Sequence, residues 1–171
     1  MAKSAAQSNV ETVQGLYQSF AEGDIDAVVG TWAPDIELIE SEGLVGSGTF
    51  RGVDEILKNV FSGLANDWKD VSVVPERYID GGESVVALIV WSGTNVRTGK
   101  STEFRGAHVF DFEDGKITRW TSYADSALFN EAHRAREDGT STRVPRGITH
   151  DELHSTTDGP TFYQSLGRHP Y

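Results

Sequence analysis

Two ionisable side chains fall inside otherwise apolar patterns, and together they could perform acid–base chemistry. Glu40 continues an alternation in which Ile36 and Leu38 share its side of the chain. His108 belongs to a second alternating series, whose other members are Phe104, Gly106, Phe110 and Phe112. A carboxyl group in an apolar pocket has a raised pKa, which suits a general base, and a neutral imidazole can donate a hydrogen bond or carry a proton. We therefore expect Glu40 and His108 to be a catalytic pair.

Each candidate also has a purely structural interpretation. If the strand ends before Glu40, its carboxylate lies in solvent beside Glu42, and a lone core histidine is commonly satisfied by a backbone carbonyl. Asp125 is a third catalytic candidate, because it ends a strand and could face the mouth of a pocket. The alternative for Asp125 is that it caps a short helix beginning at Ser126.

The elements that would position these residues form an α+β pattern. Apolar residues repeat at helical spacing over 9–22, from Asp24 to the residue before Pro34, and over 53–64. Alternating or strongly apolar stretches predict strands over 35–40, 71–79, 84–94, from 101 to the Asp-Gly turn at 114–115, and over 117–124. This order predicts helices packed on one face of a curved antiparallel sheet, with a cone-shaped cavity between them. The glycine-rich stretch 41–50 is expected to be a mobile flap over that cavity.

Aromatic, aliphatic and small polar side chains supply the expected substrate contacts. The residues that we predict to contact substrate are Tyr17, Trp32, Leu88, Val90, Phe110, Trp120 and Ser122. Trp91 has the opposite parity to Val90, so we expect it on the outer face of the sheet. The same outer face is expected to carry a solvated or interfacial row of charges: Glu103, Arg105 and Arg119.

The totals of the chain exclude several classes of function. A net charge of −11 over 171 residues leaves little to neutralise phosphates, so we expect neither nucleic acid nor an anionic membrane as a partner. The chain has no cysteine, which excludes disulfides and thiolate chemistry. No apolar stretch resembles a signal sequence or a membrane span, so we expect a soluble, cytoplasmic protein. His150 and His154 lack a third ligand, and the sequence predicts no metal site.

Composition also sets the expected domain boundaries. Residues 1–8 are expected to be disordered, residues 9–132 to form the folded domain, and residues 133–171 to form an extended C-terminal tail that is polar and rich in turn formers. Phe162 and Tyr163 suggest that this tail docks either on its own domain or on a partner subunit. The sequence leaves both arrangements open.

Three stretches carry a resemblance to a known family: LYQSFAEGDIDAVVGTWAPDIELIE, TFRGVDEIL and HVFDFEDGKITRWTSYAD. Over residues 9–130 the chain resembles the SnoaL-like branch of the NTF2-like superfamily. Its relatives include ketosteroid isomerases, polyketide cyclases, limonene epoxide hydrolases and scytalone dehydratases. The resemblance implies an NTF2-like cone and a homodimer.

The resemblance to ketosteroid isomerases also assigns roles to particular positions. Their general base falls at Glu40, and the protonated acid that donates to the oxyanion falls at His108. Their oxyanion tyrosine falls at Leu16, one step from Tyr17. Two of the three roles therefore have a residue at the matching position.

The epoxide hydrolases match less well. Their pocket tryptophan falls at Trp120, but their last-strand aspartate falls on Ser122. The charged residues of their central strand fall among Leu88, Val90 and Ser92. Their catalytic triad does not carry over, and the same holds for the polyketide cyclases, whose acid lies near position 122.

Together these features predict a cofactor-free enzyme of the lyase, isomerase or cyclase type. Glu40 would remove a proton from a small apolar, aromatic or polycyclic compound, and His108 would polarise or reprotonate the neighbouring oxygen. One alternative is a noncatalytic NTF2-like dimer that binds a small molecule. Another is the small subunit of a larger complex.

Overall fold

The computed structural model describes residues 3–135, with side chains from residue 9 onward, and most of the expected tail lies outside this range together with His150 and His154. Helices α1 (Lys3–Glu22) and α2 (Ile25–Gly30) precede strands β1 (Trp32–Ile39) and β2 (Thr49–Arg51). Helix α3 (Val53–Ile56), a π-helical turn (Leu57–Phe61) and α4 (Ser62–Asp67) follow as one continuous segment. The remaining elements are β3 (Trp68–Asp80), β4 (Ser84–Asn95), β5 (Ser101–Glu113), β6 (Lys116–Tyr123) and α5 (Ser126–His133).

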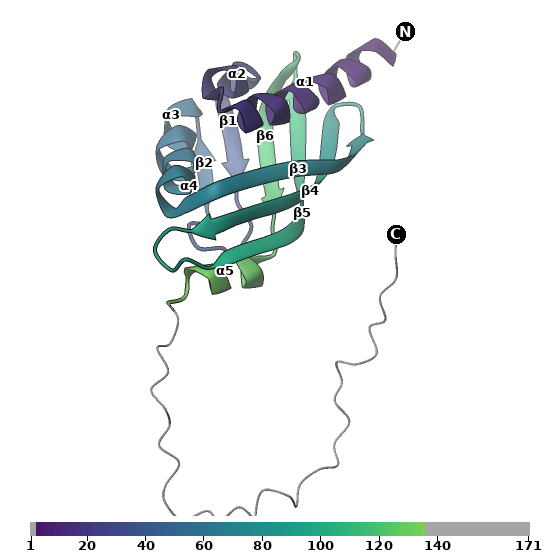
Figure 1. Ribbon diagram of the computed structural model, residues 1–171. Helices are drawn as coiled ribbons and strands as arrows, with labels where there is room; N and C mark the ends of the chain where they lie inside the picture. Colours follow the sequence, from purple (N-terminus) through teal and green to yellow (C-terminus); the bar gives the residue numbers. More distant parts are fainter. Residues whose placement is uncertain (1–2, 136–171) are drawn as a thin grey trace, which may run out of the picture. The chain divides into compact units, whose positions relative to one another are not determined.

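The strands of this part of the chain form one six-stranded sheet in the order β2-β1-β6-β5-β4-β3. Neighbouring strands are antiparallel except for the parallel pair of β1 and β6. Figure 1 shows a curved, open sheet with α1 and α2 at one end and α5 at the other. The α+β fold with a curved sheet against N-terminal helices is therefore confirmed. None of the helices in residues 3–135 is long and apolar enough to cross a membrane.

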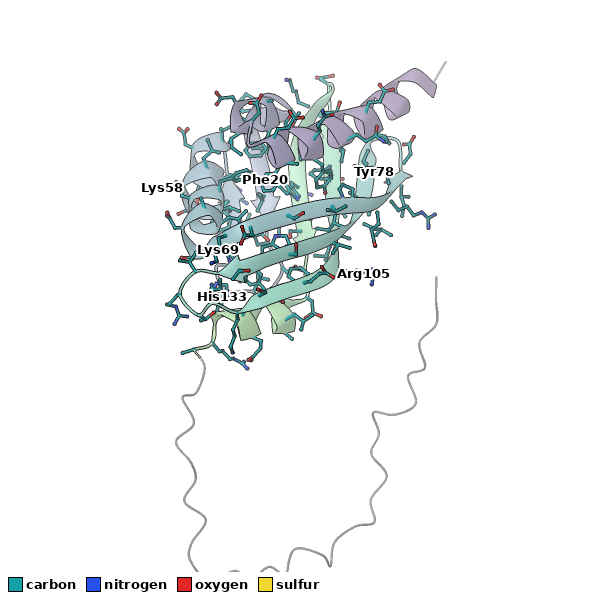
Figure 2. The ribbon with its side chains drawn as sticks, in the orientation of Figure 1. Phe20, Lys58, Lys69, Tyr78, Arg105 and His133 are labelled. Atoms are coloured by element: carbon teal, nitrogen blue, oxygen red, sulfur yellow. The ribbon has the colours of Figure 1, made fainter. Side chains whose placement is uncertain are left out.

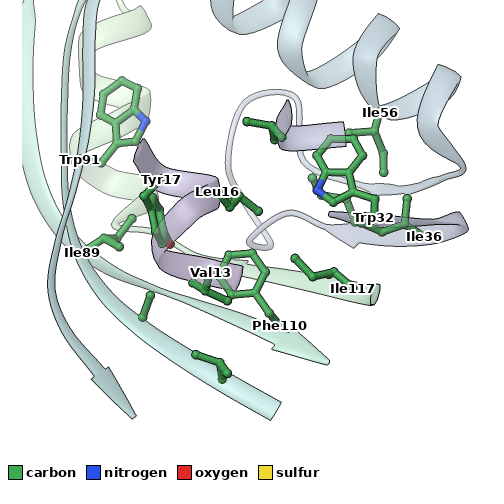
Figure 3. Close-up of a cluster of buried hydrophobic side chains, with 14 of the residues drawn as sticks. Val13, Leu16, Tyr17, Trp32, Ile36, Ile56, Ile89, Trp91, Phe110 and Ile117 are labelled. Atoms are coloured by element: carbon green, nitrogen blue, oxygen red, sulfur yellow. The ribbon is translucent and has the colours of Figure 1, made fainter. Parts of the chain in front are cut away.

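Helix α1 packs on the sheet through one apolar face. Val13, Leu16 and Tyr17 are spaced three or four residues apart, which places them on the same side of the helix, and all three are buried. Figure 3 shows them pointing towards Phe110 of β5 and Ile117 of β6, which are fully buried. This packing places Tyr17 over the middle of the sheet.

Several element boundaries differ from those that the sequence predicts. Helix α1 begins at Lys3 rather than at Asn9, and strand β3 begins earlier than expected, at Trp68. Trp32 opens strand β1, whereas the sequence pattern assigns it to the second helix. The reason is strand pairing, because Trp32 pairs with Ile117 of β6 and this tertiary contact overrides the helical pattern.

Strand β4 faces the opposite way from the sequence prediction. Its buried apolar side chains are Val85, Ala87, Ile89 and Trp91. Leu88 and Val90, expected to contact substrate, therefore lie on the outer face, and Trp91 lies on the inner face. Strand β4 is apolar on both faces, so alternation alone does not show which face points towards the core. Its pairing with β5 shows this, because Ala87 lies directly opposite His108 and directly opposed residues share a face.

Gly106 of β5 lies against the backbone at the end of β6. A Cβ atom at this position would lie 2.4 Å from the backbone oxygen of Tyr123, well inside van der Waals contact. The last paired residues of the two strands are Ala107 and Tyr123. Only glycine therefore fits position 106 without moving a backbone.

Replacing Gly106 by alanine should lower the free energy of unfolding by about 1–3 kcal/mol, because the added methyl group overpacks against a backbone atom. Gly15→Ala is the matched control, since Gly15 lies within α1 and a Cβ there meets nothing within 4 Å. That control should raise stability by about 0.5–1 kcal/mol through helix propensity. Urea unfolding of both variants checks the prediction, which is wrong if Gly106→Ala is as stable as the wild type.

Candidate active site

A cavity of about 210 Å³ lies between α1, the π-helical segment and the inner face of the sheet. Its lining is mostly apolar and comes from elements far apart in the sequence. Loop 41–48, within the expected flap, contributes Leu44, Val45 and Gly46 to the lining, and α5 contributes Phe129 and His133. Figure 2 shows the side chains in place, with Phe20 of the lining on α1 and His133 on α5.

Glu40 follows directly after β1, and its side chain lines the cavity. Burial removes water from the carboxyl group and raises its pKa above the ordinary value of 4.5. The hydroxyl of Ser122 interacts with the carboxylate and acts in the opposite direction, but burial is the larger effect. The structure thus places Glu40 on the inner side, as its alternation with Ile36 and Leu38 predicts.

The backbone on both sides of Glu40 is held by hydrogen bonds. The Glu40 N–H donates to the carbonyl oxygen of Gly48 at 2.9 Å, across the base of the loop. The hydroxyl of Ser41 donates to the carbonyl oxygen of Ser122 at 2.8 Å and accepts from the N–H of Ala124 at 2.7 Å. These bonds fasten the chain next to Glu40 to the end of β6.

His108 is buried on the inner face of β5 and forms a hydrogen bond with Tyr17 of α1. The Tyr17 hydroxyl lies 2.7 Å from Nδ1 of His108, and the two rings are nearly parallel, at 9°. Burial lowers the pKa of His108 to about 3, and burial together with Tyr78 raises the pKa of Tyr17 above 10. Both groups are therefore neutral near pH 7. We assign Tyr17 as the donor, because an imidazole nitrogen accepts more strongly than a phenol oxygen, and His108 then carries its proton on Nε2.

Glu40, Ser122 and His108 lie in one row across three neighbouring strands. His108 pairs directly with Ser122, and the pairing of Ile39 with Thr121 continues to Glu40 beside Ser122. Strands are spaced about 4.8 Å apart, so Glu40 and His108 are separated by about 10 Å at the backbone, with the small side chain of Ser122 between them. Their side chains can therefore contact one small molecule that lies over Ser122.

The other residues expected at the site divide into lining and support. Tyr17, Trp120 and Ser122 line the cavity, as predicted. Phe110 is fully buried beneath it, with ring contacts to Tyr17 and Trp120, so it supports these residues. Trp32 likewise packs against Trp120, with ring centroids 6.2 Å apart.

Asp125 has a structural position that corrects the catalytic prediction. Its side chain accepts a hydrogen bond from the N–H of Leu128 at 3.0 Å and caps the N-terminus of α5. A carboxylate in this position stabilises the first turn of a helix. The sequence left capping and catalysis open, and the structure places Asp125 in the capping role.

A group of aromatic side chains at the other end of the cavity is missed by the sequence analysis. It is formed by Trp68, Trp91, Phe104, Phe129 and His133, all of which line the cavity. Trp68 contacts Trp91 and Phe129 with centroid distances of 4.8 Å, and Trp91 stacks on Phe104 at 5.2 Å. For Phe104 the sequence did contain a signal, because it alternates in step with His108 and is therefore expected on the same face of the strand. Within residues 3–135 no three metal-binding side chains gather closely enough to hold an ion.

The protonation state of His108 should be visible in the pH dependence of stability. Its folded pKa of about 3 lies below the ordinary 6.5, so the unfolded chain binds more protons between these values and stability falls as the pH drops through this window. The slope from one such group reaches about 1.4 kcal/mol per pH unit. The raised pKa of Glu40 acts in the opposite direction just above pH 4.5.

The difference between wild type and His108→Gln isolates the histidine. In urea unfolding from pH 6.5 down to pH 5, the wild type should lose stability relative to His108→Gln by roughly 1 kcal/mol per pH unit. Tyr17→Phe removes the hydrogen bond but leaves the buried imidazole, so it should keep the wild-type slope. Parallel profiles for wild type and His108→Gln would contradict the neutral, buried state of His108.

Comparison with known proteins places this geometry among its relatives. An NTF2-like protein of Burkholderia thailandensis E264 is 34% identical, and the match covers 74% of this chain and 97% of that chain with a TM-score of 0.71. The structure of TerC co-crystallised with polyporic acid is 26% identical over 73% of this chain and 97% of that chain, with a TM-score of 0.67. An uncharacterised protein of Mycobacterium tuberculosis strain H37Rv is 27% identical over 121 residues, covering 70% of this chain and 92% of that protein.

A family comparison agrees with these structural matches. The SnoaL-like domain matches residues 13–120, a stretch that runs from α1 to the middle of β6 and makes up more than half of the chain. The matched stretch contains Tyr17, Glu40, His108 and Trp120. This chain is therefore a member of the SnoaL-like family.

Proposed function

We propose that this protein is a cofactor-free acid–base enzyme of the lyase, isomerase or cyclase type, acting on a small, apolar aromatic compound. The observation that carries the proposal is one row of side chains in an otherwise apolar cavity. In this row the carboxyl group of Glu40, with its raised pKa, and the neutral imidazole of His108 flank Ser122. Perturbed titratable groups that face one cavity are typical of acid–base sites.

In the proposed reaction Glu40 is the base. Its carboxylate takes a proton from a carbon next to a carbonyl group, the electron pair of that C–H bond forms a carbon–carbon double bond, and the π electrons of the carbonyl group move onto its oxygen. The carboxylic acid then returns the proton to another carbon in an isomerisation. In an elimination, a leaving group departs with the electron pair instead. A raised pKa makes Glu40 a stronger base than a carboxylate in water.

His108 is the proposed donor to the oxygen that gains negative charge. Its Nδ1 is bound to Tyr17, so Nε2 is the ring nitrogen that remains for a ligand in the cavity. With a pKa of about 3 the ring is neutral, and it acts by donating a hydrogen bond rather than by releasing a proton as an imidazolium. Tyr17 is a positioning residue in this scheme, because it fixes the tautomer and the plane of the imidazole.

Two kinds of comparison support a small-molecule ligand. The SnoaL-like family includes polyketide cyclases and related enzymes. TerC, which is 26% identical to this chain, was co-crystallised with polyporic acid. A noncatalytic binding protein and the small subunit of a larger complex are the alternatives, and both predict that Glu40 is dispensable for any chemistry.

Glu40→Gln should lower turnover by about 10²–10⁴-fold, the usual contribution of a general base, while changing ligand affinity little. Substrates are found by thermal shift with a panel of aromatic carbonyls and alcohols, where a ligand at a hundred times its Kd adds about 2.7 kcal/mol of stability. Glu42→Gln is the matched control and should keep full activity, because Glu42 lies exposed in the adjacent loop. If the panel yields ligands that wild type and Glu40→Gln bind equally and leave unchanged, the binding-protein alternative replaces the enzyme.

We also propose that the protein forms a homodimer through the outer face of the sheet. Val74 of β3 and Tyr123 of β6 are 54% and 57% exposed there, and Leu88 and Val90 lie between them. Arg105 of β5 lies directly opposite Val90 on the same face and forms an ion pair with Glu76 (Figure 2). A sheet face that carries exposed apolar side chains together with an ion pair suits a self-complementary twofold contact.

Sedimentation equilibrium should give a mass twice that of the 18.7 kDa chain. Val74→Arg should shift the protein to the monomer, because it buries an unpaired charge in the contact. Val96→Arg is the matched control, since Val96 is 56% exposed but lies in the turn between β4 and β5, and it should leave the dimer intact. A monomeric wild type, or a Val74→Arg variant that stays dimeric, would rule out this interface.

A further inference from the structure

Loop 41–48 forms part of the cavity wall, and most of it is exposed. Its tip, residues 44–46, lines the cavity, yet Val45 of this tip is 53% exposed. Gly43 and Gly46 have φ angles of 77° and 83°, a region in which glycine moves without the restriction of a side chain. Little is packed over this part of the wall, so the tip can move without disturbing the core.

The loop is fixed to the rest of the fold at its base. The Glu40 N–H donates to the carbonyl oxygen of Gly48, and Ser41 binds the backbone at the end of β6. Further along, the N–H of Leu44 donates to the carbonyl oxygen of Ser41 at 3.3 Å, and the N–H of Ser47 donates to that of Leu44 at 2.9 Å. These last two bonds lie within the loop and move with it. The tip must therefore be held in place by a contact from another element.

Asn130 of α5 provides this contact. Its side-chain oxygen accepts a hydrogen bond from the N–H of Val45 at 2.8 Å, and its side-chain nitrogen donates to the carbonyl oxygen of Gly43 at 2.6 Å. One amide side chain thus satisfies a donor and an acceptor of the loop backbone. Both bonds are exposed, so water can take the place of either partner when they break. The attachment favours one position of the tip but is easily reversed.

Helix α5, in contrast, is held firmly at both ends. Asp125 caps its start, and the connection between β4 and β5 binds its last carbonyl groups. The donors are Arg97, Thr98 and Lys100, which bind the carbonyl oxygens of His133, Ala132 and Glu131, respectively. Phe129, next to Asn130, packs against Trp68 and Trp91. When the two bonds of Asn130 break, the loop is therefore the partner that moves.

We propose that loop 41–48 is a gate of the cavity and that Asn130 holds it closed. In the closed state the tip lines the cavity and is bound to Asn130. In the open state both bonds are broken, the tip has moved away from α5, and a small molecule enters or leaves. Asn130 is not among the lining residues, so it controls access to the cavity without contacting what is bound inside. The inference concerns access alone and does not depend on the proposed reaction.

A single engineered thiol measures this access without a known substrate. The chain has no cysteine, and Ser122→Cys places one thiol at a position in the cavity lining that is only 7% exposed. Mass spectrometry follows its reaction with methyl methanethiosulfonate, a small uncharged reagent, at about pH 8, where a thiolate forms. Adding Asn130→Ala should speed this reaction by about fivefold or more, because the loss of two hydrogen bonds shifts the opening equilibrium. Alanine also favours a helix more than asparagine does, so α5 is preserved.

Glu131→Ala in the same Ser122→Cys background is the matched control. Glu131 is the next residue of α5, and its ion pairs with Lys100 and Arg134 involve no part of the loop. This variant should keep the original reaction rate. Asn130→Asp is a second test, because it keeps an acceptor for the N–H of Val45 but places an oxygen against the carbonyl group of Gly43. It should also speed the reaction, and it serves if Asn130→Ala does not fold.

Amide hydrogen exchange separates opening of the gate from general loosening. In Asn130→Ala the exchange should become faster in residues 42–47 and stay unchanged in β5. The inference is overturned if the thiol reacts equally fast, or not at all, with and without the Asn130 substitutions. It is also overturned if Glu131→Ala speeds the reaction as much, or if exchange becomes faster throughout β5. No turnover is measured, so the result is independent of whether Glu40 is a base.

Discussion

The pairing of β5 with its two neighbours is the constraint on which the rest of this structure depends. His108 lies opposite Ala87 of β4 on one side and opposite Ser122 of β6 on the other. Because side chains alternate with a period of two, a slip of one residue on either side would turn every inward group of that neighbour outward. A single register therefore determines which side chains form the polar row, which form the aromatic group in the cavity, and which lie on the outer face.

Placing polar groups inside an apolar cavity requires that they satisfy one another. A buried imidazole nitrogen without a partner would cost about 1–3 kcal/mol, and the hydroxyl of Tyr17 supplies that partner from a helix more than ninety residues earlier in the chain. The same bond holds the ring in one plane and one tautomer. The packing of α1 on the sheet therefore has a chemical consequence, because Val13 and Leu16 fix the helix that presents Tyr17.

The sequence allows the polar row to be predicted and the aromatic group only in part, for a physical reason. Strand β5 carries Glu103 and Arg105 on one face and aromatic residues on the other, so its sequence shows which face points towards the core. The inward position of His108 follows from this pattern. Strand β4 is apolar on both faces. Which face points towards the core is determined by its pairing with β5 and cannot be read from the sequence of β4 itself. This is why Leu88 and Val90 were expected inside and Trp91 outside.

Local ambiguity explains the other differences. Asp125 ends a strand and precedes a helix, and a carboxylate there is compatible with either a catalytic or a capping position until the hydrogen bond to Leu128 is known. The start of α1 at Lys3 is likewise not marked by the apolar spacing, which begins near Asn9. The order of helices and strands, in contrast, follows from periodicity over long segments, where the signal is strongest.

The backbone around Glu40, the proposed base, is held in place by hydrogen bonds from several elements. Regular pairing of β1 ends at Ile39, so the residue that follows would be free to move if nothing else held it. Ser41 replaces the missing ladder by bonding both to the carbonyl of Ser122 and to the N–H of Ala124, on either side of Tyr123. The loop that follows is fixed in turn by Asn130 of α5, which bonds to the backbone of Gly43 and Val45. Because effective proton transfer requires a base to be held near its productive geometry, the loop and α5 would act on the proposed chemistry through the placement of Glu40, although neither would supply the reacting group.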